Sequence, residues 1–292
     1  MFDTLKTLLG WQWFPRRKSQ PTPPDDPVLP AAKLTIQWGK DPQQTVTLCM
    51  PARRASERVA IFLLFHGGGW WQGDPDAPNV VDAKVSWLNP QGIAFASGGY
   101  RLGTRSTPKI TPDQEAQDVA DLVAHLRANA DDLGIDMDRF VLSGHSAGGE
   151  LTAEALTTLG VKANGYLGLD SACYSVPDAM KVPIRDPDLK QVYVDAWGDD
   201  PAYWAKCSPL ENMRAAPPPM LLPCSTERGP ANIAQANAFA AKARTFGVQA
   251  DVIEIDLEHG EMNSMLGRTD TPVAADYTAQ VMAFVRKCIG QG

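Results

Sequence analysis

The chain of 292 residues is 44% hydrophobic and 21% charged, an ordinary globular composition with enough apolar material for one large core. Its formal net charge is −7, and no basic cluster carries interleaved aromatic residues, so we expect no nucleic-acid partner. No apolar run approaches the roughly 20 residues that a membrane-spanning helix requires, so we expect no transmembrane segment.

The first thirty residues differ in pattern from the rest of the chain. MFDTLKTLLGWQWF has apolar residues at near-helical spacing, and basic PRRK follows it, an order that does not fit a secretion signal. This pattern predicts a short amphipathic helix that packs on its own domain or on a second copy of the chain. Interfacial membrane binding is the alternative. Proline-rich QPTPPDDPVLP reads as a linker, so we expect an arm and linker at 1–30 and one domain at 31–292.

Eight segments of the domain carry strand patterns. Segments 33–38 and 45–50 alternate and are separated by GKDPQQ, which predicts a hairpin. Of the six that follow, the first two are almost wholly apolar, as expected for strands buried on both faces. The six are 59–67, 92–97, 139–144, 165–171, 219–226 and 250–259.

Helical patterns separate most of these strands. The clearest covers 113–130, with apolar residues on one face and polar ones on the other, and further helices are expected at 147–160, 231–246 and 272–289. Strands that alternate with helices predict an α/β fold with one mostly parallel, eight-stranded sheet flanked by helices. Residues 172–218 lie between the sixth and seventh strands, and an insertion of that length is typical of a lid or pocket wall.

The cysteines and histidines give little sign of a metal or redox site. The five cysteines are scattered without a C-x-x-C motif, which favours reduced thiols and a cytoplasmic location. The four histidines form no H-E-x-x-H or similar zinc arrangement. We therefore expect neither a metal nor a cofactor.

The segment GHSAGGE, residues 144–150, follows the apolar strand RFVL and precedes a helical pattern. A strand–turn–helix around G-x-S-x-G is the context of a nucleophile elbow, in which small neighbours let the serine rise above the sheet edge. The helix N-terminus also directs backbone N–H groups at developing negative charge. The segment predicts Ser146 as a nucleophile.

A second, independent signal is HGGGWW, residues 66–71, directly after the strand VAIFLLF. Three successive glycines allow the backbone to direct amide hydrogens at an oxyanion, which an acyl-transfer site requires. Trp70 and Trp71 close this loop and are candidate substrate-binding residues, although a tryptophan at either position fits a buried core equally well. A pocket here, walled by the 172–218 insertion, suggests a small to medium acyl or aryl group.

The general base is expected to be His259. His66 belongs to the glycine loop, His145 is adjacent to the nucleophile, and His125 lies on a predicted helix. His259 follows the last strand, where a base at the carboxyl edge of a parallel sheet should lie.

The third member of the triad is less clear from the sequence. Glu227 is the only carboxylate in the loop STERGPANI after the seventh strand, and this place in the fold favours Glu227 as the acid of the triad. Asp170, at the end of the sixth strand, is the alternative. Asp256 and Glu258 lie too near His259 along the chain to present their carboxylates well to its imidazole.

With HGGGWWQGD, GGYRLGT, GHSAGG and a terminal HG in this order, the chain from about residue 55 onward resembles α/β-hydrolase esterases. It is most similar to the branch of hormone-sensitive-lipase-like carboxylesterases and kynurenine formamidases. The resemblance implies an α/β-hydrolase fold, Ser146 as nucleophile and His259 as base. It also implies an oxyanion hole made by the N–H groups of Gly68, Gly69 and Ala147. Glu150 departs from the family, which usually has an apolar residue or histidine there.

The expected function is that of a serine carboxylesterase acting on small to medium esters through a Ser-His-Glu triad and a covalent acyl-enzyme. An arylformamidase, which uses the same machinery on N-formyl amides, is the first alternative. A catalytically silent relative that binds a small ligand is the second. The expected partner is a small-molecule ester, and homo-oligomer formation remains open.

Overall fold

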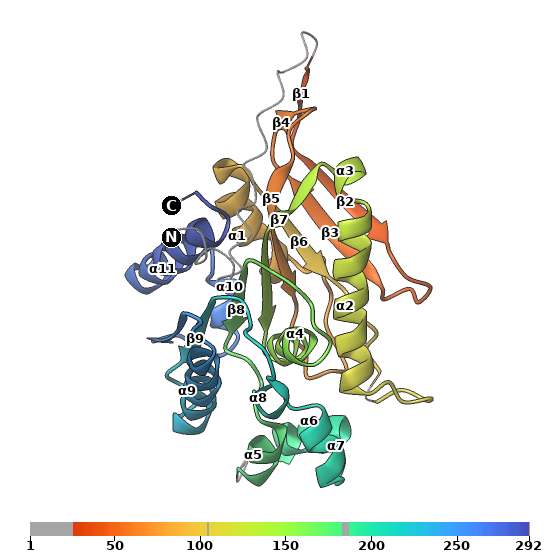
Figure 1. Ribbon diagram of the computed structural model, residues 1–292, viewed down its shortest axis with the longest axis vertical. Coiled ribbons are helices and arrows are strands. Elements are labelled where there is room, and N and C mark those ends of the chain that lie inside the picture. The colour runs from red at the N-terminus through yellow and green to blue at the C-terminus, as the bar shows by residue number, and fades with distance from the viewer. Residues whose placement is uncertain (1–25, 104, 183–186, 292) are drawn as a thin grey trace, which may run out of the picture.

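The computed structural model describes residues 26–103, 105–182 and 187–291, in which a central sheet has helices on both faces (Figure 1). The predicted amphipathic helix at the start of the chain lies outside these residues. The main sheet has the order β10-β9-β8-β7-β5-β6-β3-β2. Its strands are β2 (Ala32–Gln37), β3 (Thr45–Met50), β5 (Val59–Phe65), β6 (Ile93–Gly98), β7 (Ile135–His145), β8 (Gly165–Leu169), β9 (Met220–Ser225) and β10 (Ala250–Ile255).

This arrangement confirms the predicted eight-stranded, mostly parallel sheet. Strands β5 to β10 run parallel to one another, whereas β3 pairs antiparallel with both β2 and β6. A separate two-stranded pairing of β1 (Val28–Leu29) with β4 (Arg53–Arg54) was not predicted, and neither was the early start of β7 at Ile135. The register between β5 and β7 shifts at Ala60 and Ile61, where the added length of β7 joins the ladder.

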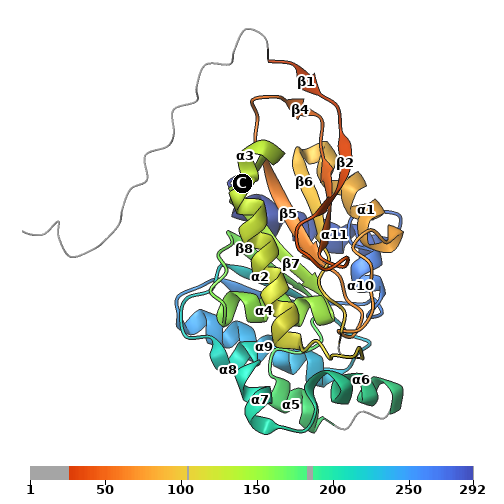
Figure 2. The same ribbon diagram turned by 90° about the vertical axis from the view of Figure 1, so that its right-hand side faces the viewer.

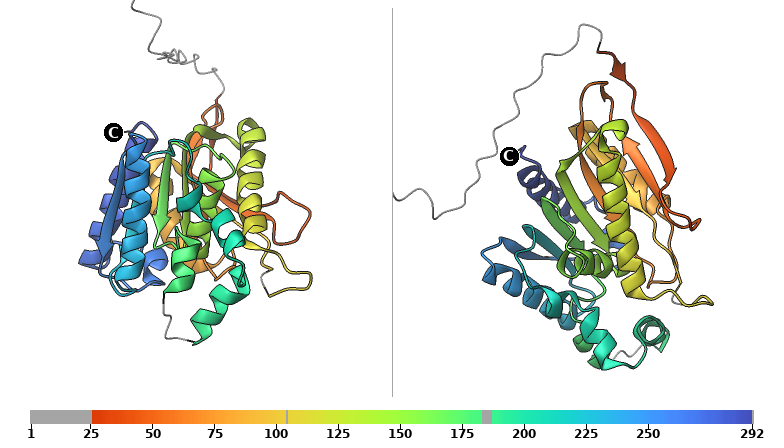
Figure 3. Two further views of the ribbon diagram at one scale, coloured as in Figure 1. Left: turned by 60° about the horizontal axis from the view of Figure 1, so that its bottom comes forward. Right: turned by 45° about the vertical axis from the view of Figure 1, so that its right-hand side comes forward.

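Strand β5 is buried on both faces, as its apolar run predicts. Ile61, Leu63 and Phe65 pack with one core cluster and Ala60, Phe62 and Leu64 with the other. The first cluster is covered by α2 (Pro112–Ala128), α4 (Ala147–Thr157) and α9 (Pro230–Thr245), and the second by α1 (Pro78–Leu88) and α11 (Pro272–Cys288). Figures 2 and 3 show these helices on opposite sides of the sheet.

The segment between β8 and β9 contains four helices. They are α5 (Val176–Lys181), α6 (Pro187–Trp197), α7 (Pro201–Lys206) and α8 (Pro209–Asn212). They gather beyond the end of the sheet where α4 begins (Figures 1 and 3). This end carries the carboxyl termini of the parallel strands, so the insertion lies where a lid or pocket wall was expected. Its action as a lid remains a prediction.

Three short helices complete the described elements: η1 (Asn89–Gln91), α3 (Ala130–Leu133) and α10 (Glu261–Ser264). Among the described helices, none combines the length and the apolar character needed to cross a membrane. All five cysteines are free thiols, four of them buried.

Candidate active site

Ser146 occupies the turn between β7 and α4 with φ 54° and ψ −121°, a conformation that L-residues rarely adopt. The turn is possible because the neighbouring glycines let strand and helix approach closely. A Cβ on Gly148 would lie 2.4 Å from the carbonyl oxygens of Phe65 and His66. The strained turn lifts the serine to the carboxyl edge of the sheet, as the elbow pattern predicts.

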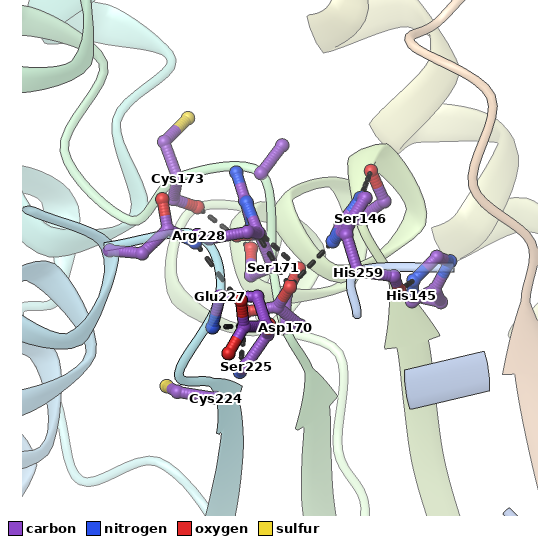
Figure 4. Close-up of polar contacts among 12 residues, drawn as sticks. His145, Ser146, Asp170, Ser171, Cys173, Cys224, Ser225, Glu227, Arg228 and His259 are labelled. Atoms are coloured by element: carbon purple, nitrogen blue, oxygen red, sulfur yellow. Dashed lines mark hydrogen bonds and ion pairs between the residues drawn. The ribbon is translucent and has the colours of Figure 1, made fainter. Parts of the chain in front are cut away.

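His259 lies in the loop between β10 and α10 and reaches both of its polar neighbours across the sheet edge. Its Nε2 is 2.9 Å from Ser146 Oγ, and its Nδ1 is 2.5 Å from Asp170 Oδ2 (Figure 4). The imidazole thus contacts the hydroxyl of Ser146, which follows β7, and the carboxylate of Asp170, which follows β8. His259 itself follows β10, and β9 lies between β8 and β10 in the sheet.

Asp170 directly follows β8 with φ 42°, and its side chain is fully buried. The N–H of Ser225 donates to Oδ1 at 3.1 Å, and Arg228 Nη1 lies 3.4 Å from Oδ2. Arg228 also donates to the carbonyl oxygens of Asp170 and Ser171. Burial opposes ionisation of this carboxyl, but the hydrogen bond to His259 and the charge of Arg228 outweigh it and lower the pKa of Asp170.

The geometry corrects the preference for Glu227 as the carboxylate on the histidine. Glu227 is exposed, and its backbone N–H donates to Ser225 Oγ at 3.1 Å. In the loop after β9, Arg228 points toward the triad instead (Figure 4). The loop therefore supplies a cation that supports Asp170, and the alternative named from the sequence is the residue that contacts His259.

The other two histidines near the site are buried and support its backbone. His145 Nε2 lies 2.9 Å from the carbonyl oxygen of His259, so its N–H can fix the loop that carries His259. Burial lowers the pKa of His145 to about 3 and also lowers the pKa of His66. His66 stacks on Tyr100, whose hydroxyl donates to the His66 carbonyl oxygen at 2.9 Å.

The glycine loop after β5 faces Ser146 across a cleft. Gly68 has φ 137° and Gly69 φ 60°, conformations that favour glycine, and both line the cleft together with Ser146. Among the described residues, neither glycine donates its N–H to another backbone group. Ala147 is the first residue of α4, where the backbone N–H has no partner within the helix. Three amides are thus available near the serine.

The cleft itself has a volume of about 450 Å³. Its lining includes the glycine loop with Trp71, residues at the start of α1, and Gly260 and Asn263. Leu189 and Val192 of α6 close it from the side of the insertion. A cleft of this size, lined mainly by apolar atoms with a few polar groups, is typical of a small-molecule site.

The two tryptophans of the loop have different environments. Trp71 is half-buried, lines the cleft and has the Arg105 guanidinium 4.3 Å from its ring centroid. Trp70 is only 1% exposed and packs edge-on against Tyr193 and Trp197 of α6. The expectation that Trp70 binds substrate is therefore wrong, because the insertion covers its ring, while Trp71 stays a candidate.

Among the described residues, no group of three or more histidine, cysteine, aspartate or glutamate side chains is arranged to hold a metal ion. The chemistry that the arrangement offers is nucleophilic: a hydroxyl on a strained turn, an imidazole that accepts its proton, and a carboxylate that orients the imidazole.

Comparison with known proteins gives partial matches to this chain. Residues 47–182 match the BD-FAE family model. This matched range includes β5, the glycine loop, Ser146 and Asp170. A curated arylesterase of Saccharolobus solfataricus is 28% identical over 130 residues, 44% of this chain and 40% of the relative. An Aspergillus terreus protein named FAD-linked oxidoreductase pytB is 30% identical over 174 residues, 57% of this chain but only 19% of that protein. The chain thus spans less than half the length of these curated relatives.

The fold match covers nearly the whole chain. The structure of Thermogutta terrifontis esterase 2 phosphonylated by sarin superposes with a TM-score of 0.70 at 21% identity, covering 94% of this chain and 98% of that one. Together with the mostly parallel sheet and the strained serine turn, this superposition shows that the chain has the α/β-hydrolase fold.

Proposed function

We propose that this chain is a serine carboxylesterase in which Ser146 is the nucleophile, His259 the base and Asp170 the acid. The observation that carries the proposal is the pair of contacts made by His259: 2.9 Å from Nε2 to Ser146 Oγ and 2.5 Å from Nδ1 to Asp170 Oδ2. The first distance lies within the reach that general-base activation of a hydroxyl requires, and the second joins the other ring nitrogen to a carboxylate that can orient the imidazole. The names of the arylesterase and esterase relatives support an ester as the substrate.

In the proposed reaction, Ser146 Oγ attacks the ester carbonyl while His259 Nε2 accepts the hydroxyl proton. The carbonyl oxygen becomes an oxyanion and accepts hydrogen bonds from the N–H groups of Gly68, Gly69 and Ala147. The tetrahedral intermediate collapses, the bond to the alcohol breaks, and His259 returns its proton to the leaving oxygen. The products of this half are a free alcohol and an acyl-enzyme on Ser146.

Water completes the cycle. His259 accepts a proton from the water as its oxygen attacks the acyl carbon, and the same amides hold the second oxyanion. Collapse breaks the bond to Ser146 Oγ, which recovers its proton from His259, and the carboxylic acid leaves. Throughout, Asp170 keeps the imidazole in one tautomer and stabilises its positive charge.

The cleft supports a small to medium substrate. Its volume of about 450 Å³ and its wall of Leu189, Val192 and Trp71 suit a short acyl chain or an aryl group beside the serine. This preference for esters with a short acyl chain or an aryl group is part of the proposal. Neither the cleft nor the relatives above favour an N-formyl amide, so we do not carry the formamidase alternative further.

The test compares wild type with Ser146→Ala, using p-nitrophenyl acetate as substrate and a fluorophosphonate as covalent probe. We expect the wild type to hydrolyse the ester and to be labelled, and the variant to lose about 10⁴-fold or more in kcat and all labelling. A wild type that is neither active nor labelled would favour the silent, ligand-binding alternative. If the wild type is much more active on N-formylkynurenine than on phenyl acetate, the result would favour an arylformamidase instead.

A further inference from the structure

Glu150 joins the nucleophile helix to the glycine loop. It lies one turn after Ser146 in α4, and its N–H donates to the Ser146 carbonyl oxygen at 3.2 Å. Its Oε2 accepts the indole N–H of Trp70 at 3.0 Å. Trp70 directly follows Gly69, so this one hydrogen bond connects the two segments that face each other across the reacting carbonyl.

Trp70 adopts a backbone conformation that needs support from its surroundings. Its φ of 63° lies in the left-handed region, which is strained for a bulky residue. The sides of its ring are held by Tyr193 and Trp197, with ring centroids 5.6 and 5.5 Å away. Those aromatic contacts restrain the plane of the ring, whereas the hydrogen bond to Glu150 restrains its direction. A ring fixed in this way also fixes the adjoining Gly68–Gly69 backbone.

The environment of Glu150 shows what kind of group is needed there. Glu150 is fully buried, and Glu154 one turn later in α4 is 2% exposed. Burial raises the pKa of both carboxyl groups well above the usual range, and among the described residues Glu150 Oε1 is buried with no hydrogen-bond partner. Glu150 therefore serves as a buried hydrogen-bond acceptor rather than as a charge, and a neutral amide of the same shape can replace it.

We propose that Glu150 is a positioning residue for the oxyanion hole, acting through the indole of Trp70 to hold the N–H groups of Gly68 and Gly69 toward the reacting carbonyl. This inference rests on the proposed function, because the N–H groups of Gly68 and Gly69 bind an oxyanion only if the protein catalyses acyl transfer. Glu150 does not touch the cleft, and it acts on the loop rather than on the substrate.

The experiment measures kcat and KM on p-nitrophenyl acetate for Glu150→Gln, Glu150→Met, Trp70→Phe and the Glu150→Met/Trp70→Phe double variant. Methionine keeps the length of the side chain without the acceptor, and phenylalanine keeps an aromatic ring without the donor. We expect Glu150→Met and Trp70→Phe each to lower kcat about 10- to 100-fold with KM within about 3-fold, since misplaced donors cost transition-state binding. Glu150→Gln should stay within about 3-fold of wild type. The double variant should be no slower than the slower single variant, because both break the same bond.

Glu115→Met is the matched control for Glu150→Met, since Glu115 is another fully buried carboxyl but its partner is the N–H of Gly103. Its kcat should not change. Retained kcat in a folded Glu150→Met variant would overturn the inference, and so would fold-losses that multiply in the double variant. If Glu150→Met does not fold, Trp70→Phe decides in the same way, with an unchanged kcat overturning the inference. A wild type no more active than Ser146→Ala would defeat the proposed function instead.

Discussion

Asp170 Oδ2 lies 2.5 Å from His259 Nδ1, although Asp170 follows β8 and His259 follows β10, with β9 between these strands in the sheet. The intervening strand supports the contact rather than supplying the carboxylate. At its end, the N–H of Ser225 and the guanidinium of Arg228 both approach the Asp170 carboxyl group. Burial raises the pKa of Asp170, but the hydrogen bond to His259, together with these contacts, lowers it below its usual value and so favours the ionised carboxylate.

Exchanging the two candidate acids for their amides distinguishes their roles. We expect Asp170→Asn to lower kcat on p-nitrophenyl acetate about 10⁴-fold, because an amide neither selects the right imidazole tautomer nor stabilises its positive charge. Glu227→Gln should change kcat less than about 2-fold, since Glu227 is exposed and its backbone, not its carboxyl, makes the contact with Ser225. Circular dichroism of both variants checks the fold. The assignment fails if Glu227→Gln is the slower of the two.

The comparison of Asp170 with Glu227 shows where sequence reasoning reached its limit. Local pattern predicted the eight strands, Ser146 and the loop at Gly68 and Gly69, because apolar runs and glycine turns act on residues close in the chain. Choosing the acid required knowledge of which side chain in the loop after β9 points inward. There Arg228, not Glu227, turns toward the triad. A carboxylate directly at the end of a buried strand was the available signal for Asp170.

Trp70 and α1 illustrate the same limit. The burial of Trp70 is caused by Tyr193 and Trp197, more than 120 residues further along the chain, so no local pattern could reveal it. Helix α1 was not predicted, and its inner face carries the fully buried Lys84, whose Nζ donates to the Asn263 carbonyl oxygen at 2.6 Å. A lysine on the buried face interrupts the apolar stripe by which helices are recognised.

The wall contributed by α6 should set the length of the acyl chain. Val192 lines the cleft, and its Cγ1 lies 2.8 Å from where a Cβ on Gly69 would be, so it packs closely over the glycine loop. We expect Val192→Ala to shift the preference among p-nitrophenyl esters toward longer acyl chains, and Val192→Trp to reduce activity on all but the shortest. Val194→Ala is the control, since Val194 is on the same helix and 40% exposed. If wild type and the three variants show the same preference for acyl-chain length, α6 does not form part of the substrate pocket.

The close contact between α4 and β5 should make Gly148 sensitive to a single added methyl group. Alanine normally stabilises a helix relative to glycine by about 1 kcal/mol. Here the new Cβ would lie 2.4 Å from two backbone carbonyl oxygens, which cannot rotate away. We expect Gly148→Ala to lower the free energy of unfolding by about 1–3 kcal/mol in urea titrations. Gly149→Ala, whose Cβ would find its nearest atoms at 3.0 Å, should cost less. Equal stability of Gly148→Ala and wild type would contradict the packing argument.

The burial of His145 should make the fold lose stability in mild acid. Burial, with the nearby His259 adding to it, lowers the pKa of His145 from 6.5 to about 3. Between these values the unfolded chain binds a proton that the folded chain does not. This contribution to stability is therefore complete above about pH 6.5 and is lost as the pH falls toward 3, by up to about 1.4 kcal/mol per pH unit.

The variant His145→Gln isolates this contribution, because glutamine does not titrate but can still donate an N–H to the His259 carbonyl oxygen. Urea unfolding between pH 4 and pH 8 should show the stability advantage of wild type over the variant shrinking as the pH falls below 6.5. Two profiles that stay parallel over this range would mean that His145 binds a proton as readily in the folded chain as in the unfolded chain. In that case, below about pH 6.5 its contact with the His259 carbonyl oxygen would come from an imidazolium, a charged donor.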